Sequence, residues 1–323
     1  MVRDAAPRGC TCCGFADKRG SRPSRQAQYS AGMASPADAR WHLGTMGFSF
    51  PDWTGPFYPR GVVPRRRLEL YASCFDTVEL DTTFHAIPPA DVVARWAAAT
   101  PDSFRFTAKA PRTVTHGGDI AHVDARDEML RFIEIITGLG PKLAVVLLQF
   151  PPHLTGEHLG ELAVLLASLP EHVRYAAEFR HESWWNKETV QLLRDRDVAW
   201  VIADEPSVEL AAVPPFDDHI GAWDYRPRPL IVSTDFVYVR WLGRHEQFPD
   251  LARERLDPSA RLEWWAQRLT EIAGPTRPVR TLYGFFNNGY AGHSPATCRR
   301  FLRLIGRPGP TFPADAEQGS LFE

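Results

Sequence analysis

The chain has 323 residues, of which 44% are hydrophobic and 24% charged, and its formal net charge is −2. This balance indicates a globular protein with a large core and gives no general support to a nucleic-acid or membrane partner, although a local basic patch stays compatible with nucleic acid. No apolar stretch approaches the roughly 18 to 20 residues of a membrane span. The five cysteines are an odd number and three crowd one short segment, so we expect no disulfide framework and a cytoplasmic location.

Residues 1–40 are rich in Arg, Ala, Ser, Pro and Gly and have no periodic apolar face. They lack the apolar core of a signal peptide, so we expect a disordered extension, or an upstream start with Met33 as the natural beginning. Cys10, Cys12 and Cys13 lie in this segment, but no second ligand pair follows at zinc-site spacing. We therefore expect no metal centre there.

From Trp41 onward, apolar β-type runs that end in polar residues alternate with helical patterns. The runs cover residues 41–47, 77–84, 104–110, 143–150, 174–180, 199–204, 236–240 and 282–288. The helical patterns lie near residues 64–74, 90–99, 124–138, 157–168, 186–196, 258–273 and 295–305. This alternation predicts an α/β protein with a single (β/α)8 TIM-barrel domain over residues 41–306, followed by a short flexible tail over 307–323.

The sixth strand is the exception to this alternation, because a long proline-containing segment follows it. Five prolines, at positions 206, 214, 215, 227 and 229, interrupt this stretch. A loop of this length fits a lid over the barrel mouth better than a separate domain.

Side chains on a strand alternate between its two faces, so residue parity separates those that point into a barrel from those that face the helices. The set expected to converge near one rim consists of Glu79, Lys109, Gln149, Glu178, Arg180, Asp204, Arg240 and Asn287. The alternative is that they form interior ion pairs, such as Glu79 with Lys109. Because buried charges are costly and barrel interiors are usually apolar, so many polar residues at strand ends favour a functional site.

At these residues the chain resembles the YecE-like family, also called domain of unknown function 72. The segments that carry the resemblance are GTMGFSFPDWTGPFYP (44–59), FDTVELDTTFHAIP (75–88), WAAATPDSFRFTAKAPRTVTH (96–116), LLQFPP (147–152), AEFRHESW (177–184), VYVRWLG (237–243) and FFNN (285–288). Several ordered motifs over about residues 41–305 are a specific signal. The resemblance implies a TIM barrel and implies no particular reaction.

Four residues are the catalytic candidates, namely Glu79, Lys109, Glu178 and Asp204. A carboxylate in a partly dry barrel interior can have its pKa raised toward neutrality, which suits a general acid or base. Lys109 is a candidate Schiff-base nucleophile if burial lowers its pKa, and the alternative is a cation paired with Glu79. The leading hypothesis is therefore a hydrolase or lyase that uses carboxylate acid–base chemistry.

The substrate-binding candidates point to an anionic ligand. Arg180 and Arg240 suit bidentate recognition of a carboxylate or phosphate, with Gln149 at the same rim. Asn287 and Asn288 lead into the last helix, near which barrels often bind phosphate. We therefore expect a small anionic or nucleotide-like substrate.

Two histidines and one tryptophan complete the candidate site. His116 and His181 follow strands three and five and suit acid–base work or metal binding, but no HExxH pattern surrounds them. A multinuclear metal centre is the less favoured alternative to hydrogen-bonded or solvent-facing histidines. Trp53 lies after the first strand and suits an aromatic wall for a sugar or base, with core packing as the alternative.

The end of the chain offers a separate hint. Gln318, Leu321 and Phe322 resemble the short Gln-x-x-Leu-Phe peptides that dock on bacterial sliding clamps, although Gly319 stands where Leu is usual. The alternatives to an enzyme are thus a clamp-tethered accessory of DNA repair or processing, and a non-catalytic ligand-binding barrel.

Overall fold

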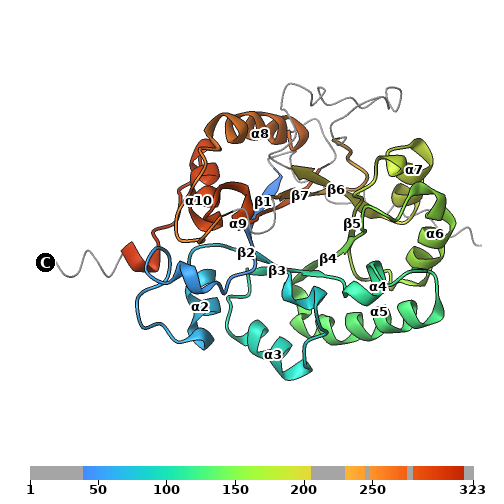
Figure 1. Ribbon diagram of the computed structural model, residues 1–323, viewed down its shortest axis with the longest axis horizontal. Coiled ribbons are helices and arrows are strands. Elements are labelled where there is room, and N and C mark those ends of the chain that lie inside the picture. The colour runs from blue at the N-terminus through green and yellow to red at the C-terminus, as the bar shows by residue number, and fades with distance from the viewer. Residues whose placement is uncertain (1–38, 205–229, 244–247, 275–278, 316–323) are drawn as a thin grey trace, which may run out of the picture. The chain divides into compact units, whose positions relative to one another are not determined.

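Eight parallel strands close into a barrel in which each strand pairs with its neighbours in chain order and β8 returns to β1 (Figure 1). This computed structural model describes residues 39–204, 230–243, 248–274 and 279–315. The strands are β1 (Arg40–Met46), β2 (Thr77–Leu80), β3 (Arg105–Lys109), β4 (Leu143–Gln149), β5 (Tyr175–Glu178), β6 (Val198–Asp204), β7 (Phe236–Trp241) and β8 (Thr281–Phe286). The predicted (β/α)8 barrel is confirmed.

Helices form a ring around the strands (Figure 1). They are α2 (Arg67–Ala72), α3 (Ala90–Ala98), α4 (Arg112–Thr115), α5 (Val123–Ile136), α6 (Leu159–Ser168), α7 (Lys187–Asp195), α8 (Ser259–Ile272), α9 (Asn288–Ala291) and α10 (Ser294–Leu304). Short 3-10 turns lie at Pro51–Trp53, Pro64–Arg66, Thr82–Phe84, Thr137–Lys142, Gly156–His158 and Glu182–Trp184. Each longer helix buries one apolar face; in α7 this face carries Val190 and Leu193, and the Asn186 side chain caps the first turn.

Two apolar clusters occupy the two faces of the sheet. The larger one lies between strands and helices and contains Val78 and Phe106. The smaller one comes from strand residues of the opposite parity, such as Leu147 and Tyr238, and fills the barrel interior. Because Glu79 alternates with Val78 and Leu80, its side chain points inward, as residue parity predicts.

Several expectations fall on residues that the structure does not describe. The N-terminal extension, most of the proline-containing segment after β6 and the sliding-clamp motif lie outside the described ranges. Of the segment assigned to a flexible tail, residues 307–315 are described, and Phe312 is buried against Phe57 with a ring-centre distance of 4.9 Å. Among the described residues, no helix combines the length and apolar character needed to cross a membrane.

Candidate functional site

An arginine inside the barrel joins two glutamates from other strands. Arg240 of β7 donates to both carboxylate oxygens of Glu79, from Nε at 3.1 Å and from Nη2 at 2.7 Å. Its Nη1 donates to Glu178 Oε2 at 2.5 Å. The side chains of all three are at most 3% exposed, so their charges are neutralised by one another and not by water. We call Glu79, Glu178, Arg240 and Tyr238 the luminal network.

Tyr238 supports this network from within the barrel. Its hydroxyl donates to Glu79 Oε2 at 2.8 Å and lies 2.8 Å from Thr107 Oγ1. Tyr238 is not among the residues singled out from the sequence, because a tyrosine in an apolar run is typical of a core position. Burial raises the pKa of Tyr238, so the hydroxyl remains a donor to the carboxylate at neutral pH.

Burial also changes the acid–base properties of the charged members. It raises the pKa of Glu79, and Arg240 opposes that rise. Burial alone lowers the pKa of Arg240, but Glu79 and Glu178 outweigh it and raise that pKa well above its usual range. Glu178 also forms an ion pair with Arg180, whose side chain is 26% exposed. The charged groups of the luminal network are therefore paired with one another, and Arg180 is their more exposed neighbour.

Lys109 lies beside this network at the carboxyl end of β3. Its Nζ is 3.2 Å from Asp81 Oδ1 and 3.8 Å from the centre of the Phe84 ring. The expected partner, Glu79, is taken by Arg240, so the predicted Glu79–Lys109 ion pair is wrong. Asp81 stands just after β2, at the start of the 3-10 turn that also presents Phe84. Burial lowers the pKa of Lys109, while Asp81 raises it.

His116 lies close to the same lysine. Its ring meets the edge of Phe84 at 5.0 Å between centres, and its Nδ1 is 2.8 Å from Thr115 Oγ1. Burial, followed by repulsion from Lys109 and other nearby cations, lowers the pKa of His116 to about 4. The imidazole is therefore neutral at pH 7. Lys109, Arg112 and Arg180 are among these cations, so several positive charges lie near the His116 ring.

The remaining rim candidates are held by local hydrogen bonds. Gln149, on the inward face of β4, donates from Nε2 to Phe150 O at 3.0 Å. His181 Nδ1 accepts from Ser183 N at 3.2 Å and so caps the turn Glu182–Trp184. Asn287 Oδ1 accepts from Gly289 N at 2.7 Å and caps α9. These bonds fix the backbone of the loops around the mouth.

Trp53 and Asn288 pack together away from the luminal network. Trp53 Nε1 donates to Asn288 Oδ1 at 3.2 Å, and the same oxygen accepts from Ser294 N at 3.0 Å and Ser294 Oγ at 2.9 Å. Trp53 is fully buried and Asn288 is 4% exposed. Their polar atoms thus join the loop after β1 to the start of α10, which agrees with the core-packing alternative for Trp53.

Asp204 faces the helices and not the barrel interior. Val201 and Ala203 belong to the interior cluster, and Asp204 lies on the other face of β6. Its predicted inward position is therefore wrong. Its Oδ2 accepts from Arg261 Nε at 2.9 Å, Trp265 Nε1 at 2.7 Å and Tyr290 Oη at 2.8 Å. We call Asp204, Arg261, Trp265 and Tyr290 the outer cluster. It fastens the end of β6 to α8 and α9.

Within the described ranges, no group of three or more His, Cys, Asp or Glu side chains is arranged to hold a metal ion. The ion pairs at the mouth join carboxylates to arginine and lysine. These positively charged side chains would repel a metal cation and occupy the carboxylates that could bind it. The arrangement is suited to proton transfer and to the binding of an anion near Lys109, His116 and Arg180.

Proteins of similar sequence occur in several bacteria. The UPF0759 protein YecE of Escherichia coli K12 is 29% identical over 284 residues, covering 84% of this chain and 98% of YecE. The UPF0759 protein YunF of Bacillus subtilis is 27% identical over 272 residues, covering 77% of this chain and 89% of YunF. The crystal structure of a DUF72 family protein from Thermotoga maritima superposes with a TM-score of 0.64 at 30% identity, covering 83% of this chain and 100% of that protein.

A family model described as protein of unknown function DUF72 matches residues 42–319. The match includes β2 to β8, all of β1 except its first two residues, and every residue of the luminal network. The chain therefore belongs to the DUF72 family.

Proposed function

We propose that the protein is an enzyme of the hydrolase or lyase class that acts on a small anionic substrate at the carboxyl-terminal rim of the barrel. The observation that supports this most is the environment of Lys109. The residue is 8% exposed, and its amine lies 3.2 Å from Asp81 Oδ1 and 3.8 Å from the centre of the Phe84 ring. A lysine whose pKa is lowered by burial can exchange protons with a substrate near neutral pH.

In this proposal Lys109 and Asp81 share the proton transfer. The Asp81 side chain is 41% exposed, so a bound substrate can reach it, whereas both glutamates of the luminal network are almost fully buried. Lys109 accepts or donates the proton at Nζ, and Asp81 stabilises the ammonium form. This moves the carboxylate role from Glu79 and Glu178 to Asp81.

The substrate's anionic group would lie near Arg180 and neutral His116. Arg180 is 26% exposed and is oriented by its ion pair with Glu178, and a guanidinium suits the recognition of a carboxylate or phosphate. Neutral His116 can donate or accept a hydrogen bond without a change in charge. In this proposal the luminal network has a positioning role, because Glu178 holds Arg180 through their ion pair.

The test is a turnover screen of phosphorylated and carboxylated metabolites, followed by proton NMR of the substrate signals. We expect Lys109→Met and Asp81→Asn to lower turnover by about 100-fold or more, the usual size of an acid–base contribution. Lys187→Met changes an exposed lysine at the start of α7 and is the matched control. A ligand that binds wild type and stays chemically unchanged would instead support a non-catalytic binding barrel.

A further inference from the structure

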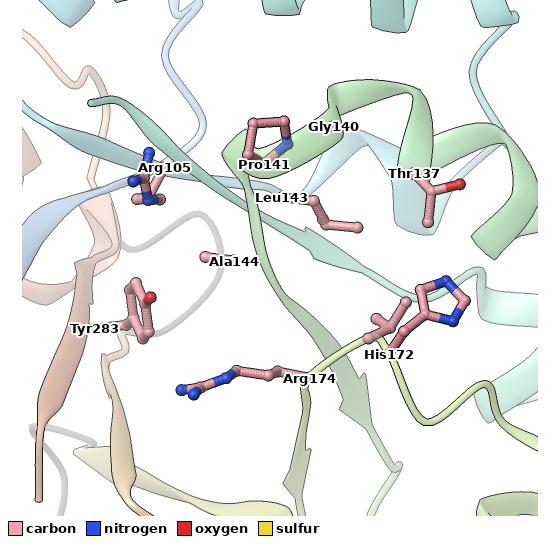
Figure 2. A pocket seen from close by; sticks show the side chains of 10 residues that line it. Arg105, Thr137, Gly140, Pro141, Leu143, Ala144, His172, Arg174 and Tyr283 are labelled. Atoms are coloured by element: carbon pink, nitrogen blue, oxygen red, sulfur yellow. The ribbon is translucent and has the colours of Figure 1, made fainter. Parts of the chain in front are cut away.

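A cavity of about 470 Å³ lies at the opposite, amino-terminal end of the barrel. Residues at the beginnings of neighbouring strands line it, as Figure 2 shows: Arg105 begins β3, Leu143 begins β4 and Arg174 immediately precedes β5. Tyr283 of β8 completes the wall. Lys109 lies at the opposite end of the barrel, where the strands end and where barrel enzymes carry out their chemistry, so this cavity is separate from that rim.

The two arginines of the cavity are held in position by the protein. Arg105 Nη1 donates to Asp102 O at 2.8 Å and to Phe104 O at 2.9 Å. Arg174 Nη1 is 3.4 Å from Asp235 Oδ1. Each guanidinium has five N–H donors, so these contacts orient the groups and leave further donors for a ligand.

Tyr283 places a third donor between them. Its ring stacks on His42 with centres 5.3 Å apart, and in the described part of the chain its hydroxyl has no hydrogen-bond partner. Burial raises the pKa of Tyr283, and Arg174 and Arg105 oppose the rise, which means that both guanidiniums lie near this hydroxyl. Figure 2 shows the three side chains along one side of the cavity.

The rest of the lining is suited to a carbon skeleton. Pro141, Leu143 and Val173 contribute apolar surface, and His172 stands on the side away from Tyr283 (Figure 2). The volume lies within the range of about 300 to 1,000 Å³ that is usual for small-molecule sites. Guanidinium groups recognise carboxylate and phosphate through paired charge-assisted hydrogen bonds.

We propose that this cavity binds a small organic anion, whose carboxylate or phosphate group lies between Arg105, Arg174 and Tyr283. This site does not depend on the reaction proposed for the other rim. The described residues that line it include no lysine, so we interpret it as a binding site for an anionic ligand and not as a second copy of the Lys109 site.

The test is titration of the full chain with inorganic pyrophosphate, followed by phosphorus NMR and calorimetry. We expect saturable binding that is about tenfold weaker or more in Arg105→Gln/Arg174→Gln, since hydrogen bonds to charged groups are lost. Arg40→Gln changes an exposed arginine at the start of β1 outside the cavity and should bind as wild type does. Arg180→Gln, at the other rim, identifies any pyrophosphate that binds there instead of in this cavity.

Two results would overturn the proposal: no saturable binding to wild type, or binding that survives the double substitution and disappears in Arg180→Gln. Should the double variant fail to fold, Tyr283→Phe decides the matter, because it removes one hydroxyl and keeps the stacked ring. We expect roughly threefold weaker pyrophosphate binding in that variant. An unchanged affinity in a folded Tyr283→Phe protein would mean that pyrophosphate binds outside this cavity, which would contradict the proposal.

Discussion

The luminal network and the outer cluster are built from the same chemistry but face opposite sides of the sheet. In the first, Arg240 joins two glutamates inside the barrel. In the second, Asp204 accepts from Arg261, a tryptophan and a tyrosine beneath the helices. The centres of both are buried, yet only the luminal network lies beside the buried Lys109 and its partly exposed partner Asp81.

This difference indicates how a polar strand end should be interpreted. A carboxylate whose oxygens are all used by helix side chains fastens two layers together and leaves nothing for a ligand. A carboxylate–arginine network in the interior can instead orient a neighbouring group at the mouth. The comparison therefore predicts that the outer cluster affects stability alone, whereas changes near the luminal network affect both stability and the rim.

Arg240→Met should have the largest effect. It leaves Glu79 and Glu178 buried without their shared cation, and we expect the free energy of unfolding at pH 7 to fall by about 3 to 5 kcal/mol. Urea denaturation measures the change. Adding Glu79→Gln and Glu178→Gln should recover most of it. An equal loss in the triple variant would mean that packing, and not charge, holds the interior together.

Asp204→Asn should have the next largest effect. The amide keeps the shape of the side chain but loses the charge that Arg261 contacts. We therefore expect the free energy of unfolding to fall by about 2 kcal/mol. Turnover or ligand binding at the Lys109 rim should be unchanged for the folded protein. A rim defect as large as that of Lys109→Met would contradict the division between the two regions.

The pKa of Lys109 offers a direct measurement near the luminal network. The chain has only four lysines, Lys18, Lys109, Lys142 and Lys187, so carbon-13 labelling gives few signals and Lys109→Arg identifies one of them. We expect a pKa below the usual 10.5, and a further decrease in Asp81→Asn because Asp81 is the first of the groups that raise it. A normal value in both proteins would remove the main support for Lys109 as a proton carrier.

The smallest expected effect is on the pH dependence of stability. The folded-state pKa of His116 is about 4 and its ordinary value is 6.5, so between these values the unfolded chain binds a proton that the folded protein does not. Stability should therefore fall as the pH falls from 6.5 to 4. Chemical denaturation across this range should show a shallower fall in His116→Gln. If the free energies of unfolding of wild type and His116→Gln changed in parallel with pH, His116 would have the same pKa in the folded and unfolded states.

The sequence predicts the barrel and most inward positions because the runs of β2, β3 and β5 each have one clearly apolar face. It fails at β6, where Ala199 to Ala203 are apolar at every position and parity cannot identify the inward set. Both faces of a parallel barrel strand are buried, so such a run fits either orientation. The side on which Asp204 lies is decided by Arg261 and Trp265, which come from a helix about 60 positions away.

The ion-pair partner of Lys109 could not be identified from the sequence for a different reason. Parity along the run 77–84 places Asp81 on the inward face with Glu79, but it does not show that Asp81 stands one residue past the end of β2, where a 3-10 turn redirects the chain toward Lys109. Pairing between neighbouring strands pointed to Glu79, but Arg240 reaches across the interior and makes two hydrogen bonds to it. The choice between these cations depends on side-chain length and position in three dimensions.

The seam of the barrel has a consequence for folding kinetics. β1 pairs with β8, and Trp53 bonds Asn288 across 235 positions of sequence, so closure of the ring joins the two ends of the domain. The chain entropy lost on such a contact is repaid only after the intervening strands are in place. We therefore expect the seam to form late in folding. In the native protein we expect it to open locally, so that its amide hydrogens exchange before those of the strands on the opposite side of the barrel.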